Sequence, residues 1–267
     1  MRIALVIALS ILCSAVKSQT PHKVFYPDGK LRGEGQIDSA GKLNGLWVFY
    51  FEGGMKQSEG LYAHGQATGA WFFWSEWGRL ESHGYYKEDK MDSLWRLFAP
   101  NGQITQVESY KAGIKHGIYV KYHSDTIKSE AGYYNNGLKH GTWRTWHENG
   151  VLKEEANFKN GIGEGTIKNW YASGQLQFAG QQSNDKATGH WKFYDATGAL
   201  ISEGDYKNGE WVGKWSSYHT NGKVSSTGYF NNGKKIKKWK YFNTEGKLIR
   251  EEYYKNEKLF KEVIYAQ

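Results

Sequence analysis

Hydrophobic and polar positions along the chain form short runs that are separated by glycines. The runs are too short for helices and are rich in Trp, Tyr, Phe, Val, Ile and Thr, which favours β-strands. Asn-Gly dipeptides between the runs supply the positive φ angles that tight hairpin turns need. They include Asn136-Gly137, Asn149-Gly150, Asn160-Gly161, Asn208-Gly209, Asn221-Gly222 and Asn232-Gly233. The pattern therefore predicts consecutive β-hairpins.

The same pattern returns every 24 residues across nine copies. A tryptophan slot holds Trp47, Trp71, Trp95, Tyr119, Trp143, Ile167, Trp191, Trp215 and Trp239. Three residues later a second aromatic slot holds Tyr50, Trp74, Phe98, Tyr122, Trp146, Trp170, Tyr194, Tyr218 and Phe242, and Tyr26 fits this slot one period earlier. A fixed period of this size is typical of repeat proteins, in which each copy packs mainly on its neighbours. We therefore predict an all-β, elongated repeat protein whose antiparallel hairpins form one long twisted sheet.

The second strand of each copy carries a glycine beside large aromatic residues. Ser82, Gly84 and Tyr86 have the same parity, so they share one face of the strand. We expect Gly84 and its equivalents to leave room for a ring from the next strand. Trp71 and Trp74 are three residues apart and cannot both face inward on a regular strand. Either a bulge intervenes or the second ring packs at the turn.

The chain divides into four parts. Residues 1–18 are a predicted signal peptide, and 19–44 are an irregular first repeat with a shorter first turn and a longer following hairpin. Residues 45–256 are tandem repeats, and 257–267 are a C-terminal capping strand. Two copies depart from the pattern: the copy at 93 has Asp89, Ser93 and Glu108 in glycine slots, and the copy at 165 has Ile167 and Gln182 in aromatic slots.

The N-terminus has the composition of an export signal. Arg2 is followed by an apolar run over 3–16 that is too short to span a membrane comfortably. Small residues at Val16 and Ser18 favour cleavage before Gln19. Cys13 is the only cysteine, so a mature chain cleaved there has no thiol or disulfide, although a lipid anchor on Cys13 is an alternative. We expect an exported protein, either periplasmic, cell-surface or secreted.

The chain is basic, with 35 Lys and Arg against 27 Asp and Glu. Lysines cluster at Lys234, Lys235, Lys237, Lys238 and Lys240. One interpretation is a surface for anionic lipid, glycan or acidic protein. The simpler interpretation is solvated strand edges, where lysine also discourages aggregation. A nucleic-acid role is not expected of an exported chain.

Repeated titratable residues do not indicate catalysis. His123, His147 and His219 share one slot, and His116 and His140 share another, but copies lie too far apart for one metal ion. Glu59, Glu155, Glu203 and Glu251 also share a slot, with Glu34 similar in the first copy, which indicates a structural hydrogen bond or cross-strand pair. The sequence predicts no catalytic residue, no metal site and no cofactor.

Ten of the twelve tryptophans fall in the two aromatic slots and are predicted to be core. Trp77 and Trp211 do not fit either slot and are the candidate binding residues. Each is either an exposed platform on which a ligand such as a sugar ring stacks, or a side chain that packs over a hairpin end.

The unit G-x-W-x-x-Y-x-x-N-G-x-L-x-x-E-G-x-Y-x-N-G resembles the MORN repeat variant. Residues 141–164, 189–212 and 213–222 carry it best, and the resemblance extends over about residues 23–256. It implies an elongated sheet of hairpins and links the chain to protein contacts, membrane association and scaffolding. The same repeat occurs in proteins labelled YwqK-type antitoxins, which implies toxin binding as another possibility.

The leading hypothesis for function is an exported, non-enzymatic scaffold that binds another protein. The alternatives are a glycan, cell-wall or membrane-surface binding module, and an antitoxin-like protein that binds a toxin. An enzyme is not expected, because no catalytic constellation is present in the sequence.

Overall fold

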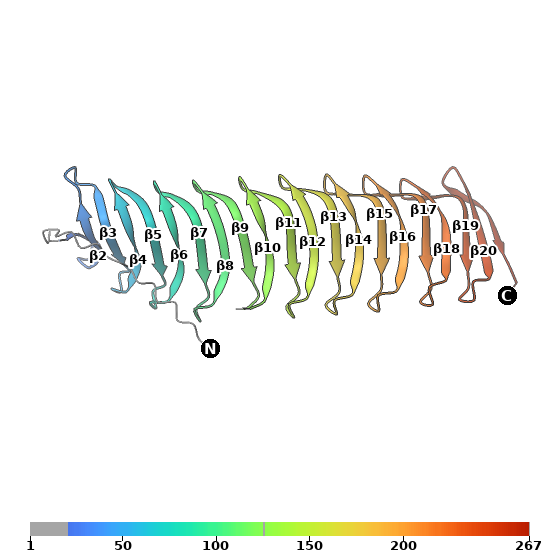
Figure 1. The fold of residues 1–267 in the computed structure, drawn as a ribbon, viewed down its shortest axis with the longest axis horizontal. Coiled ribbons are helices and arrows are strands. Elements are labelled where there is room, and N and C mark those ends of the chain that lie inside the picture. Colours follow the sequence, from blue (N-terminus) through green and yellow to red (C-terminus); the bar gives the residue numbers. More distant parts are fainter. Residues whose placement is uncertain (1–20, 125, 267) are drawn as a thin grey trace.

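The computed structural model describes residues 21–124 and 126–266, and these residues form a single 21-stranded sheet. Each strand pairs antiparallel with the strands before and after it in the chain, so β1 and β21 are the two edges (Figure 1). The strands are β1 (His22–Phe25), β2 (Leu31–Ile37), β3 (Leu43–Tyr50), β4 (Lys56–Ala63), β5 (Gln66–Trp74), β6 (Leu80–Lys87), β7 (Lys90–Phe98), β8 (Ile104–Lys111), β9 (Ile114–Tyr122), β10 (Lys128–Asn135), β11 (Leu138–Trp146), β12 (Leu152–Lys159), β13 (Ile162–Trp170), β14 (Leu176–Ser183), β15 (Lys186–Tyr194), β16 (Leu200–Lys207), β17 (Glu210–Tyr218), β18 (Val224–Asn231), β19 (Lys234–Phe242), β20 (Leu248–Lys255) and β21 (Lys258–Ile264). The predicted all-β sheet of consecutive hairpins is confirmed.

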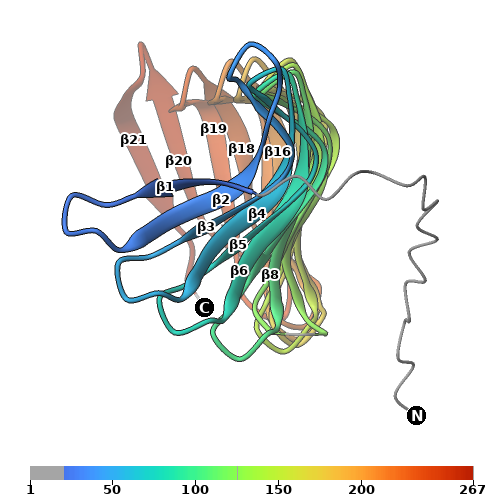
Figure 2. The same cartoon turned by 90° about the vertical axis from the view of Figure 1, so that its left-hand side faces the viewer.

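The sheet is one layer thick, and its strands curve strongly, so that the molecule resembles a trough seen from its end (Figure 2). The described residues supply no second layer to cover either face. Each face must therefore bury its apolar side chains against neighbours on the same face. This requirement explains why large flat aromatic rings dominate the repeat.

Two kinds of turn alternate along the sheet. At Asn136-Gly137 both residues have positive φ angles, 48° and 82°, as the two-residue hairpin turn requires. At Asn149-Gly150 only the glycine does, because this turn is longer: the His147 N–H donates to the Val151 carbonyl at 2.9 Å. Asn149-Gly150 and Asn221-Gly222 therefore form turns, as predicted, but in each turn the glycine alone supplies the positive φ angle.

A bulge at each tryptophan creates the core of the repeat. Between β16 and β17, Gly204 pairs with Trp215 and Asp205 pairs with Val212, so two residues of β17 have no partner there. The Asp205 carbonyl is left without a ladder partner, and the Trp215 indole N–H donates to it at 3.2 Å. The same bond, to the carbonyl after the glycine slot, recurs at Trp47, Trp71, Trp95, Trp143, Trp191 and Trp239.

The glycine slot exists because the indole lies directly on the backbone. A Cβ at Gly84 would stand closer than 3.0 Å to the Trp95 ring, a separation that real Cβ atoms do not show. The prediction that glycine leaves room for a ring of the next strand is confirmed. All seven tryptophans of the slot are at most 8% exposed. We call their side of the sheet the tryptophan face.

The second aromatic slot lies on the other side of the sheet. Trp71 and Trp74 belong to one regular strand, and the register shift beside Trp74 is absorbed by the partner strand β6. The two rings therefore lie on opposite faces of β5, with Trp71 stacked on Phe73 and Trp74 on Phe72, so neither predicted alternative brings both rings to one face. Trp74, Trp146 and Trp170 are only partly buried, so their assignment to the core was wrong. A single layer has two faces, and the period alone does not say which one a slot occupies.

The irregular first copy differs from its prediction. The Tyr26 N–H donates to the Lys30 carbonyl at 2.8 Å, as the Phe51 N–H does to Met55. Tyr26 is thus the first turn residue, not a member of the second aromatic slot, and the first turn has the ordinary length. The one additional residue lies in the turn that the Asp38 N–H closes on the Lys42 carbonyl. This turn has three central residues, where the equivalent turns of other copies have two.

Candidate binding surfaces

Trp77 stands at the tip of the turn between β5 and β6 and is 79% exposed. The turn is well defined, because Ser75 accepts from the Gly78 N–H at 2.9 Å and donates its own N–H to Arg79 at 2.8 Å. No other aromatic ring among the described residues contacts Trp77. The indole borders a hollow of about 120 Å³, whose other lining residues are Ser75, Arg79, Leu80, Glu81, Phe98, Ala99 and Pro100. Trp77 is therefore an exposed platform.

Trp211 is the opposite case. Its ring centroid is 4.9 Å from that of Phe230 and 5.3 Å from that of Trp215, and 41% of the residue is exposed. It lies on the tryptophan face and enlarges the aromatic column. It is the second residue of β17, beside a two-residue turn, whereas Trp77 lies in a longer turn at the opposite ends of the strands, so the structure does not bring the two together.

A stack of rings lies beside the Trp77 turn, on the face opposite the tryptophan face. Phe72 contacts Trp74 with centroids 6.1 Å apart, and His83 lies 5.4 Å from Phe72 and 5.6 Å from Phe98. Burial lowers the pKa of His83, and nearby Arg96 acts in the same direction, so both favour the neutral imidazole within the stack. The N-terminal part of the sheet thus carries aromatic rings on both faces.

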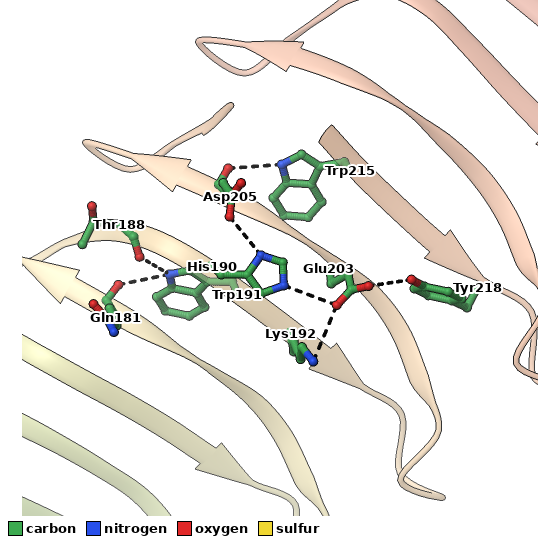
Figure 3. Close-up of polar contacts among 9 residues, drawn as sticks. All are labelled: Gln181, Thr188, His190, Trp191, Lys192, Glu203, Asp205, Trp215 and Tyr218. Atoms are coloured by element: carbon green, nitrogen blue, oxygen red, sulfur yellow. Dashed lines mark hydrogen bonds and ion pairs between the residues drawn. The ribbon is translucent and has the colours of Figure 1, made fainter. Parts of the chain in front are cut away.

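One polar cluster joins His190 to two carboxylates (Figure 3). The imidazole Nδ1 lies 2.9 Å from Asp205 and Nε2 lies 3.3 Å from Glu203. Glu203 also accepts from the Tyr218 hydroxyl at 2.6 Å and lies 3.7 Å from the Lys192 ammonium. The Tyr218 hydrogen bond is the main cause of the lowered pKa of Glu203, although partial burial opposes it. Both imidazole nitrogens face carboxylates and no nucleophile, so the cluster is a network of cross-strand pairs.

The whole glutamate slot behaves in this way. Glu155 pairs with Arg144 at 2.7 Å, Glu59 pairs with Lys56 at 2.6 Å, and Glu251 pairs with Lys238 at 3.2 Å. Glu34 accepts from the Tyr50 hydroxyl at 2.9 Å. Glu59 and Lys56 lie on the same strand, whereas the other pairs join neighbouring strands, so the prediction of a structural hydrogen bond or cross-strand pair is confirmed.

The histidines of the first slot connect successive turns. Nε2 of His123, His147 and His219 donates to the carbonyls of Trp146, Trp170 and Phe242, at 2.8–2.9 Å. Each bond joins one copy to the next. His116 and His140 lie at the opposite ends of the strands, near the two-residue turns. His116 Nδ1 accepts from the Asn136 N–H at 3.4 Å. Within the described part of the chain, no three His, Asp or Glu side chains group so as to hold a metal ion.

The lysine cluster is divided between the two faces. Lys234 pairs with Glu257 at 2.6 Å, Lys235 with Glu252 at 3.2 Å and Lys238 with Glu251 at 3.2 Å. Lys235 and Lys237 also lie over aromatic rings, 4.8 Å from the centroids of Trp239 and Tyr229. Much of this charge is therefore held by partners within the sheet, and the five lysines do not form one patch.

The departures of the copy at 93 from the pattern are compensated by neighbouring residues. Glu108 fills a glycine slot, and Tyr119, the residue opposite, is smaller than the usual tryptophan. Glu108 is buried, 2.8 Å from the Lys115 ammonium and 2.6 Å from the Tyr110 hydroxyl that donates to it. Burial raises the pKa of Tyr119 to about 12, and burial followed by the Glu108 contact raises the pKa of Tyr110 further.

The sequence contained a signal for this compensation. The glycine and tryptophan slots lie 11 residues apart in the regular copies, as in Gly84 and Trp95. Comparing positions at that spacing pairs Glu108 with Tyr119 and Ala156 with Ile167. In both pairs a larger residue replaces glycine where a smaller one replaces tryptophan.

The rows of equivalent side chains define an open-sheet repeat protein, a class in which each copy is stabilised by its neighbours. The model of the MORN repeat variant family matches five segments of the chain, residues 20–38, 139–160, 187–208, 211–232 and 235–265, so these segments are repeats of that family. Residues 39–138 lie outside the matched segments, yet Trp47, Trp71 and Trp95 have the same geometry there.

Solved structures show only distant similarity. A structure titled "Crystal Structure of TcdB2-TccC3-Cdc42" is 13% identical with a TM-score of 0.19 and covers 88% of this chain and 18% of that chain. Another, titled "Crystal Structure of TcdB2-TccC3", is 14% identical with a TM-score of 0.18, at the same coverage. This chain spans under a fifth of their length, and TM-scores of this size do not establish a shared fold. No curated protein matches the sequence.

Among residues 21–124 and 126–266 there is no helix that is long and apolar enough to cross a membrane. The predicted signal peptide over 1–18, its cleavage before Gln19 and the lipid anchor on Cys13 lie outside the described residues.

Proposed function

We propose that this chain is an exported, non-enzymatic scaffold that binds an extended segment of a partner protein at Trp77. The proposal for export rests on Arg2 and the apolar run over 3–16. The proposal for protein binding rests on one observation: Trp77 is 79% exposed, more than any other aromatic residue in the described part of the chain.

The surroundings of Trp77 suit a peptide. Its hollow has an apolar wall formed by Leu80, Phe98 and Pro100, against which a proline or aromatic side chain can pack. Arg79 and Glu81 at the rim form no ion pair with any described residue, so both charges are available to a ligand. An exposed tryptophan beside an apolar pocket with charges around it is typical of residues that dominate protein interfaces.

A pull-down from the extracytoplasmic fraction tests the proposal. Wild-type protein is expected to recover a specific partner, and Trp77→Ala is expected to lose it while circular dichroism stays unchanged. Trp211→Ala is the matched control: it removes the other out-of-slot tryptophan and should keep the partner at temperatures where the protein is folded. Retention of the partner by Trp77→Ala, or recovery of no specific partner by the wild type, would contradict the proposal.

An exposed indole is also what sugar rings stack against, so a glycan is the second candidate ligand at the same site. Co-sedimentation with cell-wall polysaccharide separates the two. Sedimentation that Trp77→Ala abolishes would favour the glycan and replace the protein partner.

A further inference from the structure

The two edges of the sheet differ in how well they are protected. β1 has four residues and lies between Pro21 and Pro27, and β21 has seven residues with no proline. Short strands and prolines block the addition of another strand, because proline has no N–H to donate. On β21, Phe260 is 62% exposed and Ile264 is 75% exposed. The sheet is therefore closed at β1 and open at β21.

The register shows which backbone groups of β21 are free. The Tyr265 N–H donates to the Ile249 carbonyl at 2.9 Å, so Tyr265 faces β20. Backbone groups alternate along a strand, and the pairing runs without a shift from Arg250–Ile264 to Glu252–Glu262. The N–H and C=O groups of Glu262 and Ile264 therefore point away from β20, where a further strand would bond.

The aromatic core of the repeat ends before β21. Val263 stands one period after Trp239, and Glu252 stands one period after Gly228. The Glu252 carboxylate occupies the glycine position on the tryptophan face and is held by Lys235 at 3.2 Å and by the Tyr254 hydroxyl at 2.9 Å. A strand added to β21 would accordingly be bound by its backbone and by surface side chains, without a further buried tryptophan.

Positive charge is concentrated at this end of the sheet. Residues 207–267 hold 13 Lys and Arg against six Asp and Glu, whereas residues 21–206 hold 20 against 21. Lys255, Lys258 and Lys261, on and beside β21, form no ion pair with the described residues. A second copy of the chain would bring the same excess of positive charge to the edge, and like charges on adjacent strands repel.

We infer that β21 takes up an extended acidic segment of a partner protein as an additional antiparallel strand. The pairing of Glu251 with Val263 and of Tyr253 with Lys261 places Lys261 on the face opposite the tryptophan face. Acidic side chains of the segment pair with Lys258 and Lys261 on that face, and its aliphatic side chains cover Ile264 on the tryptophan face. This inference rests on the proposed binding role but concerns a separate surface, which Trp77→Ala leaves intact.

The test uses the whole chain and a labelled peptide of alternating glutamate and valine, about eight residues long so that it spans the strand. Fluorescence anisotropy is expected to show binding that a lysine–valine peptide does not share. Hydrogen exchange at the Glu262 and Ile264 amides should slow when the acidic peptide binds.

Ile264→Pro removes an outward N–H without breaking a bond to β20, so it should lower affinity for the acidic peptide about tenfold and leave the melting temperature unchanged. Lys258→Glu with Lys261→Glu should reverse the preference between the two peptides. Unchanged affinity in Ile264→Pro would overturn the inference, as would sedimentation that shows a wild-type dimer which Ile264→Pro dissociates. Trp77→Ala should bind the peptide like the wild type, so failure at Trp77 and failure at β21 are distinguishable.

Discussion

Two neighbouring copies of the repeat fill the same space on the tryptophan face in different ways. We call each pair of a ring and the residue opposite it a rung. In the first, the Trp95 indole lies on the bare backbone of Gly84 and its N–H bonds the Tyr85 carbonyl at 3.1 Å. In the second, Tyr119 lies opposite Glu108, whose carboxylate fills the space and bonds Lys115 and Tyr110. The strand spacing fixes the volume between a ring and the residue opposite it. It does not fix whether apolar or polar groups fill that volume. A ring and its opposite residue therefore change together.

The apolar rung should respond most strongly to truncation. Trp95→Ala removes a nearly fully buried indole and its hydrogen bond, and should lower the free energy of unfolding by about 3–5 kcal/mol. Equilibrium denaturation in urea measures the loss. Trp77→Ala is the control, since its exposed ring should cost less than about 0.5 kcal/mol. An equal loss in both variants would mean that burial on the tryptophan face does not stabilise the sheet.

The polar rung can be converted into an apolar one. Glu108→Gly alone leaves Lys115 and Tyr110 without their partner, and Tyr119→Trp alone forces an indole against a side chain, so each should cost about 1–3 kcal/mol. The double variant restores a glycine–tryptophan rung and should be more stable than the sum of the two changes predicts, by about 0.5–3 kcal/mol. The comparison fails if the denaturation midpoints of the four proteins are simply additive.

A smaller effect on stability is expected at Ser93, which replaces the glycine found at this bulge position in other copies. Ser93 has a φ of 55°, a conformation that is costly for residues with a Cβ. Ser93→Gly should therefore stabilise the protein by up to about 1 kcal/mol. Ser82→Gly is the matched control in a regular strand, where glycine should destabilise by about 0.5–1 kcal/mol. Thermal denaturation that moves both variants in the same direction would exclude local strain as the cause.

The sequence was sufficient for the hairpins, the period and the close approach of indole to glycine. These follow from local rules: Asn136-Gly137 makes a turn by itself, and Gly84 has one purpose at its position. It was insufficient for Trp74, because the face of a residue beyond a bulge depends on which strand absorbs the extra residue. The assignment of Tyr26 to the second aromatic slot was wrong by one residue, because the longer Asp38–Lys42 turn shifts the 24-residue period.

The candidate sites divide in the same way. Trp77 and Trp211 were both found because neither fits the period, but only the structure separates the exposed ring from the packed one. Glu108 departs from the pattern when its glycine slot is considered alone. The residue that compensates for it lies 11 positions away and becomes its neighbour only through strand pairing.

The turn-to-turn hydrogen bonds, such as that from His147 to the Trp170 carbonyl, make each copy the template for the next. Two strand spacings of roughly 4.8 Å separate equivalent residues, so every slot is a row of side chains with a pitch of about 10 Å. The sheet therefore presents its exposed side chains at a regular spacing. An exposed side chain that is changed in one copy leaves the spacing of the equivalent side chains in the other copies unchanged.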